Sequence, residues 1–226
     1  MHEVGYNLID KFRFKMTLWS RSRFILAGRY TLRRMGLKYV KMIEFVRPFD
    51  APIPMISAKI QAEIKLFVAE DANNKTYDGI RFTAGDNPSL HDKTLSRVAS
   101  GKDACLVAIV NGKVAGFVWL LFFGTNYEPA IEIEESFAEG EGLVYQLNVF
   151  AKYRKNYIAS RLIREGLRYF RSKGYIKCYS YVESDNIPSI RSFKRMGFYP
   201  VRAITCFRFF KFMQRKEIMI NKYNGF

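Results

Sequence analysis

Cysteine and histidine are scarce in this chain. Its 226 residues include three cysteines, Cys105, Cys178 and Cys206, and two histidines, His2 and His91. The cysteines are far apart, form no CxxC pair and each lie in an apolar, strand-like stretch. We therefore expect no disulfide framework and no metal site, and we interpret the cysteines as small buried apolar side chains.

Long apolar runs are also missing. No run is long enough to span a bilayer. Residues 1–20 place Asp10, Lys11, Arg13 and Lys15 among the apolar positions, so they lack the uninterrupted apolar core of a signal peptide. These absences predict a cytoplasmic protein, with a peripheral place on the inner membrane face as an alternative.

Negative charge is sparse and unevenly placed. The chain has 37 Lys and Arg against 21 Asp and Glu, a net charge of +16, which implies an anionic partner. Residues 1–50 hold eleven basic against four acidic residues, whereas residues 128–141 hold six Glu and no basic residue. Helix-like apolar spacing before Pro48, Pro52 and Pro54 predicts a basic helical extension and linker over residues 1–56, followed by a domain over residues 57–226.

The pattern of the second region predicts an α/β (α+β) domain with a mixed sheet. Alternation predicts a strand near residues 60–66, and residues 71–82 and 88–100 read as helices. Asn111-Gly112, between two apolar runs, predicts a type I′ hairpin. The pattern also predicts a parallel strand–helix–strand unit, with strands over 143–150 and 176–182 and a helix over 155–173 between them. A capped helix and strands over 199–201 and 204–212 follow this unit.

Two motifs carry a family resemblance. Residues 149–163 read VFAKYRKNYIASRLI, and residues 186–198 read NIPSIRSFKRMGF. Their spacing resembles the acyl-CoA loop and the following helix of the GNAT acyltransferase superfamily, over about residues 57–212. The physical reason is that a helix N-terminus offers unpaired N–H groups and positive potential to a pyrophosphate.

The resemblance implies a binding site for acetyl-CoA or another acyl-CoA. It comprises Val149, Phe150, Arg154, Lys155, Asn156, Tyr157, Ile158, Ala159, Ser160, Asn186, Ser189 and Phe193. Lys155 and Tyr157 stand where the family has glycine, and a side chain is tolerated there if φ stays negative. Phe193 stands where the family has the tyrosine that protonates the leaving thiolate.

The resemblance implies direct transfer of an acyl group to an amine, which needs a general base. Glu141 is the first candidate, followed by Glu134, Glu135 and Glu183, and Asn186 completes the expected catalytic set. The six-Glu patch favours a cationic acceptor, such as an amino sugar or surface-glycan precursor. A fainter resemblance, carried by the Arg-rich stretch before the linker, is to GNAT proteins of bacterial surface-polysaccharide synthesis.

Three alternatives stay open. In the first, the acceptor amine is carried by a nucleic acid such as aminoacyl-tRNA, and the basic segment binds its phosphates. In the second, the domain is a non-catalytic binding module. The third concerns the basic segment, which lies on an anionic membrane, packs on its own domain or mediates a homodimer.

Overall fold

The computed structural model describes residues 37–56, 59–68, 98–210 and 212–220. The chain forms two compact units, one of residues 1–40 and 205–216, the other of residues 41–204 and 217–226. In the first unit the described residues are ends of strands, with the rings of Phe209 and Phe210 in edge contact. All site residues considered below belong to the second unit.

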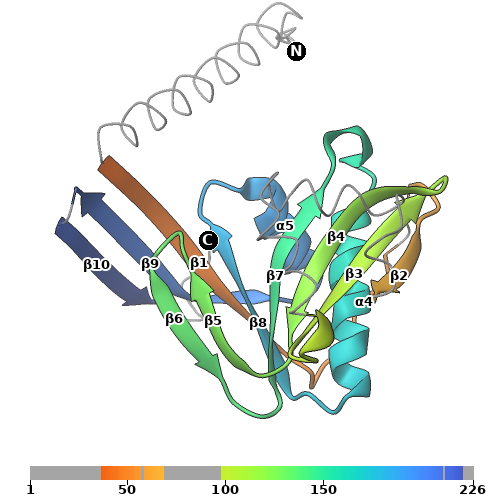
Figure 1. The fold of residues 1–226 in the computed structure, drawn as a ribbon, viewed down its shortest axis with the longest axis horizontal. Helices are drawn as coiled ribbons and strands as arrows, with labels where there is room; N and C mark the ends of the chain where they lie inside the picture. The colour runs from red at the N-terminus through yellow and green to blue at the C-terminus, as the bar shows by residue number, and fades with distance from the viewer. Residues whose placement is uncertain (1–36, 57–58, 69–97, 211, 221–226) are drawn as a thin grey trace, which may run out of the picture. The chain divides into compact units, whose positions relative to one another are not determined.

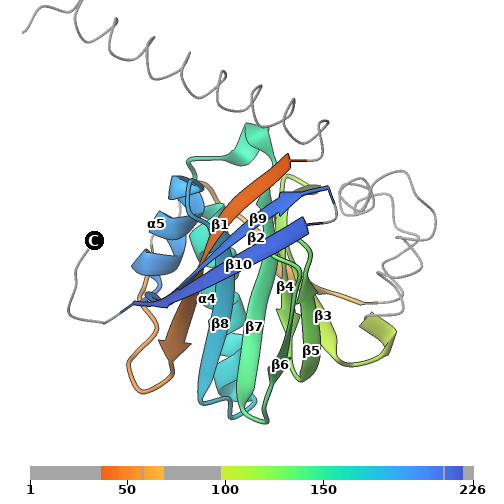
Figure 2. The same cartoon turned by 90° about the vertical axis from the view of Figure 1, so that its left-hand side faces the viewer.

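The strands form one large mixed sheet and a separate hairpin. The order in the large sheet is β10-β9-β1-β8-β7-β4-β3-β2, and β5 and β6 form a separate two-stranded sheet. Figure 2 shows β7 between β8 and β4. The strands are β1 (Leu37–Pro48), β2 (Glu63–Phe67), β3 (Asp103–Val110), β4 (Lys113–Leu121), β5 (Gly124–Glu128), β6 (Ile133–Phe137), β7 (Glu141–Val149), β8 (Lys177–Glu183), β9 (Tyr199–Phe209) and β10 (Phe212–Met219).

Helices follow β7 and β8. A 3-10 turn, η3 (Ala151–Tyr153), leads into α4 (Ile158–Ser172), and α5 (Ile187–Arg195) follows β8. Seven buried residues line one side of α4 and its outer side is basic, so the helix buries one face and exposes the other. Figure 1 shows α4 behind the sheet and the β5–β6 hairpin in front of it.

Two apolar layers cover the two faces of the sheet. Behind it, Leu120 and Val144 from the strands pack with Leu162 and Phe170 of α4. In front, a smaller cluster of Leu121, Phe137 and Leu143 holds the hairpin, with Tyr145, Tyr179 and Tyr181 packed against it. The face with α4 is therefore closed by a large core, whereas the hairpin face carries tyrosines and the acidic segment.

The structure confirms the Asn-Gly hairpin and the parallel unit. Val110 pairs with Lys113 around Asn111 and Gly112, both at positive φ, and β7 pairs with β8 in parallel. The predicted helix over 71–82 and nearly all of that over 88–100 lie outside the described residues. The β5–β6 hairpin was not predicted, and the two short C-terminal strands are a continuous β9 followed by β10.

The N-terminal extension requires a correction. Residues 37–47 were predicted to be helical, yet they form β1, which pairs antiparallel with β8 from Met42↔Glu183 to Pro48↔Lys177. The prediction was wrong for these residues because tertiary pairing with a distant strand outweighs the local helix-like spacing. β1 thus belongs to the sheet of the domain predicted to begin at residue 57, and residues 1–36 lie outside the described residues.

Candidate active site

The parallel strands β7 and β8 separate partway along their length. They pair only from Glu141↔Lys177 to Leu143↔Tyr179, although β7 continues to Val149 and β8 to Glu183. On the other side of β7, the register against β4 shifts between Phe117 and Trp119, and Gln146 has a φ of 47°. This register shift is a β-bulge, in which one strand has an extra residue. A bulge bends its strand, so this one accounts for an opening between β7 and β8.

The N-terminus of α4 follows the open end of β7 and has free donor groups. Among the residues that the structure describes, no side chain caps this helix, and its first turn contains no acidic residue. The first N–H groups of a helix have no intrahelical acceptor, and the helix dipole is positive at this end. The structure therefore places a helix N-terminus with the electrostatic character that suits an anion at the position where the sequence motif predicts a pyrophosphate. We call residues 154–160 the cradle.

The cradle keeps a glycine-like backbone without glycine. Lys155 has a φ of 67° and Tyr157, the N-cap, a φ of 61°. The condition under which a side chain is tolerated without strain at these positions, a negative φ, is therefore not met at either one. Lys155 and Tyr157, two positions apart, both take the left-handed conformation that glycine adopts freely, at a conformational cost of roughly 1–2 kcal/mol for each L-residue.

Cationic side chains surround the cradle. The ring of Tyr157 lies 4.8 Å from the Arg195 guanidinium carbon and 5.4 Å from Lys59 Nζ. Arg195 Nη1 also donates to Ser160 Oγ at 3.4 Å. Arg154 Nε donates to the Val149 carbonyl at 3.0 Å, which fixes the turn between β7 and the loop. Tyr157 thus replaces a glycine with a ring that holds two cations beside the helix end.

The remaining predicted site residues are placed as follows. Val149 is the last residue of β7, and Phe150 follows it as the N-cap of η3. Asn156 donates to the carbonyls of Tyr153 and Arg154 at 3.3 and 3.4 Å. Ile158, Ala159 and Ser160 form the first turn of α4. The Asn186 side chain caps α5 by accepting from the Ser189 N–H at 3.3 Å, which is a structural role; its catalytic role stays a prediction.

Phe193 lies in the core. It is 2% exposed, and its ring packs against Phe45 and edge-on against Phe198. A phenyl ring has no acidic proton, so the residue at this position donates none, and its contacts are those of a core side chain. Its role in binding the cofactor stays a prediction.

Glu141 has features unsuited to a general base. Its Oε1 lies 2.6 Å from Lys177 Nζ, and the hydrogen bond from Lys177 lowers the pKa of the carboxyl group. It also begins β7 at the end where β7 and β8 still pair, away from the opening. A base must reach the acceptor and hold a proton, so these observations argue against Glu141. Among the other candidates, Glu135 is bound by Arg202, and Glu183 ends β8.

Sequence reasoning missed two tyrosine–carboxylate pairs on the hairpin side of the opening. Tyr145, next to the bulge, donates to Asp103 Oδ1 at 2.6 Å, and Tyr181 donates to Glu44 Oε1 at 3.2 Å. Burial, with the charges of Glu44 and Glu135 adding to it, raises the pKa of Tyr181, so its phenol stays protonated. The partners are 42 and 137 residues apart in the chain, so local spacing gave no signal.

Arg202 connects the hairpin to the sheet. Its Nε lies 2.6 Å from Glu44, its Nη1 3.0 Å from Glu217, and its Nη2 donates to Glu135 of β6. Burial alone would lower the pKa of Arg202, but hydrogen bonds to Glu135 and Glu44 outweigh it and raise the pKa. The hairpin that carries the acidic patch is therefore held in place by charge-assisted bonds.

In residues 37–56, 59–68, 98–210 and 212–220, no group of His, Cys, Asp and Glu side chains could hold a metal ion. Among the helices of the same residues, none is long and apolar enough to cross a membrane. The three cysteines are buried and unpaired, and burial raises the pKa of Cys105 and Cys178 well above the ordinary thiol value.

Comparison with protein families identifies this arrangement. Residues 65–198 match the model of the acetyltransferase (GNAT) family. The chain belongs to the GNAT family. The matched region begins in β2 and ends after α5, so it contains the opening, the cradle and both sequence motifs. Acetyl-CoA is the co-substrate typical of this family of enzymes.

Two curated proteins match this chain at low sequence identity. The chain is 25% identical over 194 residues to a mycothiol acetyltransferase of Acidothermus cellulolyticus, covering 81% of this chain and 59% of that protein. It is 26% identical over 153 residues to a mycothiol acetyltransferase of Corynebacterium glutamicum, covering 63% and 45%. The chain thus spans about half the length of these relatives.

Solved structures support the fold. A GCN5-related N-acetyltransferase from Sphaerobacter thermophilus superposes with a TM-score of 0.53 at 18% identity, covering 86% of this chain and 57% of that one. A GNAT-family acetyltransferase from Novosphingobium aromaticivorans gives a TM-score of 0.50 at 18% identity, covering 76% and 66%. At this identity the likeness concerns the fold alone.

Proposed function

We propose that this protein is an acetyl-CoA-dependent N-acetyltransferase that transfers the acetyl group directly to a primary amine. The observation that carries the proposal is the uncapped N-terminus of α4 at the end of the opening between β7 and β8. This pairing of a helix end with a separated strand provides a pyrophosphate site and a channel for an extended chain. Membership of the GNAT family supports the same assignment.

The chain's own groups divide the work of binding. Backbone N–H groups of the first turn of α4 bind the pyrophosphate, with Arg195 and Lys59 adding positive charge. Beyond Leu143, the edge of β7 that faces β8 is released from pairing, so its backbone groups can bind the pantetheine amides. Acetyl-CoA supplies an activated thioester when bound, and β7 N–H groups near the bulge polarise its carbonyl oxygen.

Proton removal is assigned to Tyr145 and Asp103. The acceptor ammonium first loses a proton through the Tyr145 hydroxyl to Asp103, whose Oδ1 lies 2.6 Å away. The neutral nitrogen then forms the new bond to the acetyl carbon, the carbon–sulfur bond breaks, and the second proton of the nitrogen passes to water. The CoA thiolate leaves without a donor at position 193, because a thiol with a pKa of about 8.5 is a tolerable leaving group. Tyr145 is chosen because it adjoins the bulge at Gln146.

The acceptor approaches from the hairpin side in this proposal. The tyrosines and the Glu-rich segment lie on that side, while α4 and its core close the other. Negative potential favours an ammonium group over a neutral alcohol. An amino sugar, or a precursor of a surface glycan, is the class we infer, and the names of the curated relatives, mycothiol acetyltransferases, make thiol-linked amino sugars the first acceptors to try.

The test is a screen of primary amines, including amino sugars, for release of CoA thiol from acetyl-CoA, with the acetylated product identified by mass spectrometry. The proposal predicts turnover above the rate of thioester hydrolysis for at least one cationic amine. Binding of CoA without turnover of any amine would contradict it.

Tyr145→Phe tests the proton route within the same assay. We expect kcat/KM to fall at least tenfold, while the Kd for CoA changes less than twofold. Tyr175→Phe is the matched control, because Tyr175 also donates one hydrogen bond, to the Phe122 carbonyl at 2.8 Å, outside the opening. Equal activity of the two variants would refute the role of Tyr145 and leave the overall assignment standing.

A further inference from the structure

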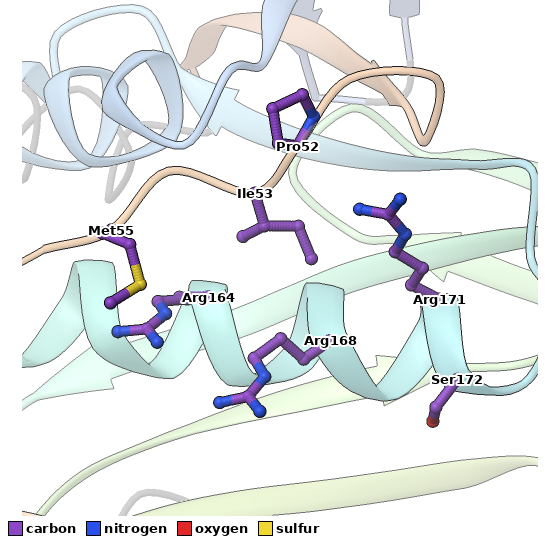
Figure 3. Close-up of a pocket in the computed structure, with 7 residues that line it drawn as sticks. All are labelled: Pro52, Ile53, Met55, Arg164, Arg168, Arg171 and Ser172. Atoms are coloured by element: carbon purple, nitrogen blue, oxygen red, sulfur yellow. The ribbon is translucent and has the colours of Figure 1, made fainter.

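A second concave, strongly basic surface lies on the outer side of α4. It is a groove of about 580 Å³ between α4 and the segment that follows β1. We call it the arginine groove; its lining residues are Pro52, Ile53, Met55, Arg164, Arg168, Arg171 and Ser172. Figure 3 shows the three arginines rising from successive turns of α4, with Ile53 pointing toward them from the opposite wall.

Positive charge in the groove is poorly balanced. Arg168 Nη1 lies 3.4 Å from Glu165, and Arg164 Nε lies 3.9 Å from the same residue. One carboxylate therefore serves two arginines, and no ion pair of Arg171 is found among the residues the structure describes. Surface ion pairs of this kind contribute at most about 1 kcal/mol, so an anionic ligand can displace them at little cost.

A fourth arginine stands behind the wall of the groove. Arg47 is 3% exposed, and its Nη2 donates to the carbonyls of Ala51 and Pro52 at 3.3 and 3.0 Å. Its Nε is buried without a hydrogen-bond partner in the described part of the chain. Arg47 thus fixes the wall and adds buried positive charge. Burial lowers the pKa of its guanidinium, and the nearby charge of Asp50 opposes this effect in part.

The groove is distinct from the cradle. Arg168 and Arg171 come ten and thirteen residues after Ile158, the first residue of α4. At a rise of 1.5 Å per residue, they lie about 15 and 20 Å along the helix from its N-terminus. The first N–H groups of α4 are the ones that bind a pyrophosphate, so these arginines, on later turns of the helix, take no part in that binding.

The chemistry of the lining selects the ligand. Guanidinium groups bind phosphate oxygens in a bidentate, planar manner. Arginines at successive turns of a helix, four and three residues apart, are separated by about 6 and 4.5 Å along the axis, which suits two phosphate groups rather than one. The apolar side chains of Ile53 and Met55 offer a surface for a base, and the volume suits a ligand of nucleotide size.

We propose that the arginine groove is a second phosphate-binding site, separate from the cradle, that takes a nucleotide unit bearing at least two phosphate groups. The unit belongs either to a free nucleoside polyphosphate or to a single strand of nucleic acid. The two sources present the same phosphate chemistry to the groove and differ in length.

The test is calorimetric titration of the full chain with ATP and, separately, with a six-nucleotide uridine strand, in low salt and with desulfo-CoA in slight excess to occupy the cradle. The proposal predicts that Arg168→Gln/Arg171→Gln weakens binding at least tenfold. The control Lys102→Gln/Lys113→Gln removes the same charge from exposed positions outside the groove and should change the Kd less than twofold. Thermal melts show whether both variants are folded.

The outcomes of these titrations either identify the source of the bound phosphate groups or overturn the proposal. Tighter binding of ATP identifies a free nucleotide as the source, and tighter binding of the uridine strand identifies nucleic acid. Equal weakening by the two double variants would show a diffuse positive field and overturn the proposal. So would an absence of binding of both ATP and the uridine strand in the presence of desulfo-CoA. Failure of desulfo-CoA itself to bind would count against the proposed function and not against the groove.

Discussion

The positive φ of Lys155 makes a quantitative prediction about stability. Lys155 is exposed, lies in the cradle at a φ of 67°, and forms no ion pair among the described residues. An L-residue in this conformation costs roughly 1–2 kcal/mol, whereas glycine adopts it freely. Glycine also loses roughly 0.5–1 kcal/mol more backbone entropy on folding. The substitution Lys155→Gly should therefore stabilise the protein by roughly 0.5–1 kcal/mol.

Lys152→Gly is the matched control. Lys152 is an exposed lysine three residues earlier, in the 3-10 turn, and its φ is not positive. Here no strain is relieved, the backbone entropy is lost, and so is the contact of Lys152 Nζ with the Tyr153 ring at 5.6 Å. This variant should therefore be destabilised by at least roughly 0.5–1 kcal/mol. Urea unfolding of both variants measures the difference, which corresponds to a few degrees in Tm for a chain of this size. If Lys155→Gly is destabilised as much as Lys152→Gly, the account of the cradle backbone is refuted.

Three other variants test the rest of the structure. Arg202→Gln leaves the buried Glu44 without its cation and should destabilise by about 3 kcal/mol in urea unfolding; a loss below 1 kcal/mol would contradict the role given to Arg202. Glu141→Gln removes a carboxyl whose pKa is lowered by Lys177, so its stability deficit should be full above about pH 5 and shrink as the pH falls below about 4; a deficit independent of pH would refute this. Gly142→Ala would place a Cβ 2.3 Å from a ring carbon of α4 and should lower Tm by several degrees, whereas an unchanged Tm would show that the ring can move.

Local features were the ones the sequence could predict. The Asn-Gly turn specifies its own hairpin, and the amphipathic spacing of α4 specifies which side is buried, because both depend on residues a few positions apart. The two motifs likewise located the cradle and the cap of α5.

Features made by distant segments could not be predicted. β1 carries apolar residues at spacings that suit a helix as well as a strand, and only its pairing with β8, about 140 residues later, decides between them. All eight residues of β10 are exposed, so no alternation marks it. Arg202 meets Glu44 and Glu135 only in the folded chain, so the composition showed an acidic patch but not the cation that holds it.

The central claim is that the uncapped N-terminus of α4 binds the pyrophosphate of CoA, and Ala159→Asp tests it most directly. Ala159 is in the first turn, where a carboxylate stabilises the helix by roughly 0.3–1 kcal/mol through the dipole. The same charge repels a bound pyrophosphate. Calorimetric titration with CoA should show at least a tenfold weaker Kd for a variant whose Tm is unchanged or higher. An unchanged Kd would mean that CoA, if it binds, binds elsewhere, and would contradict the account.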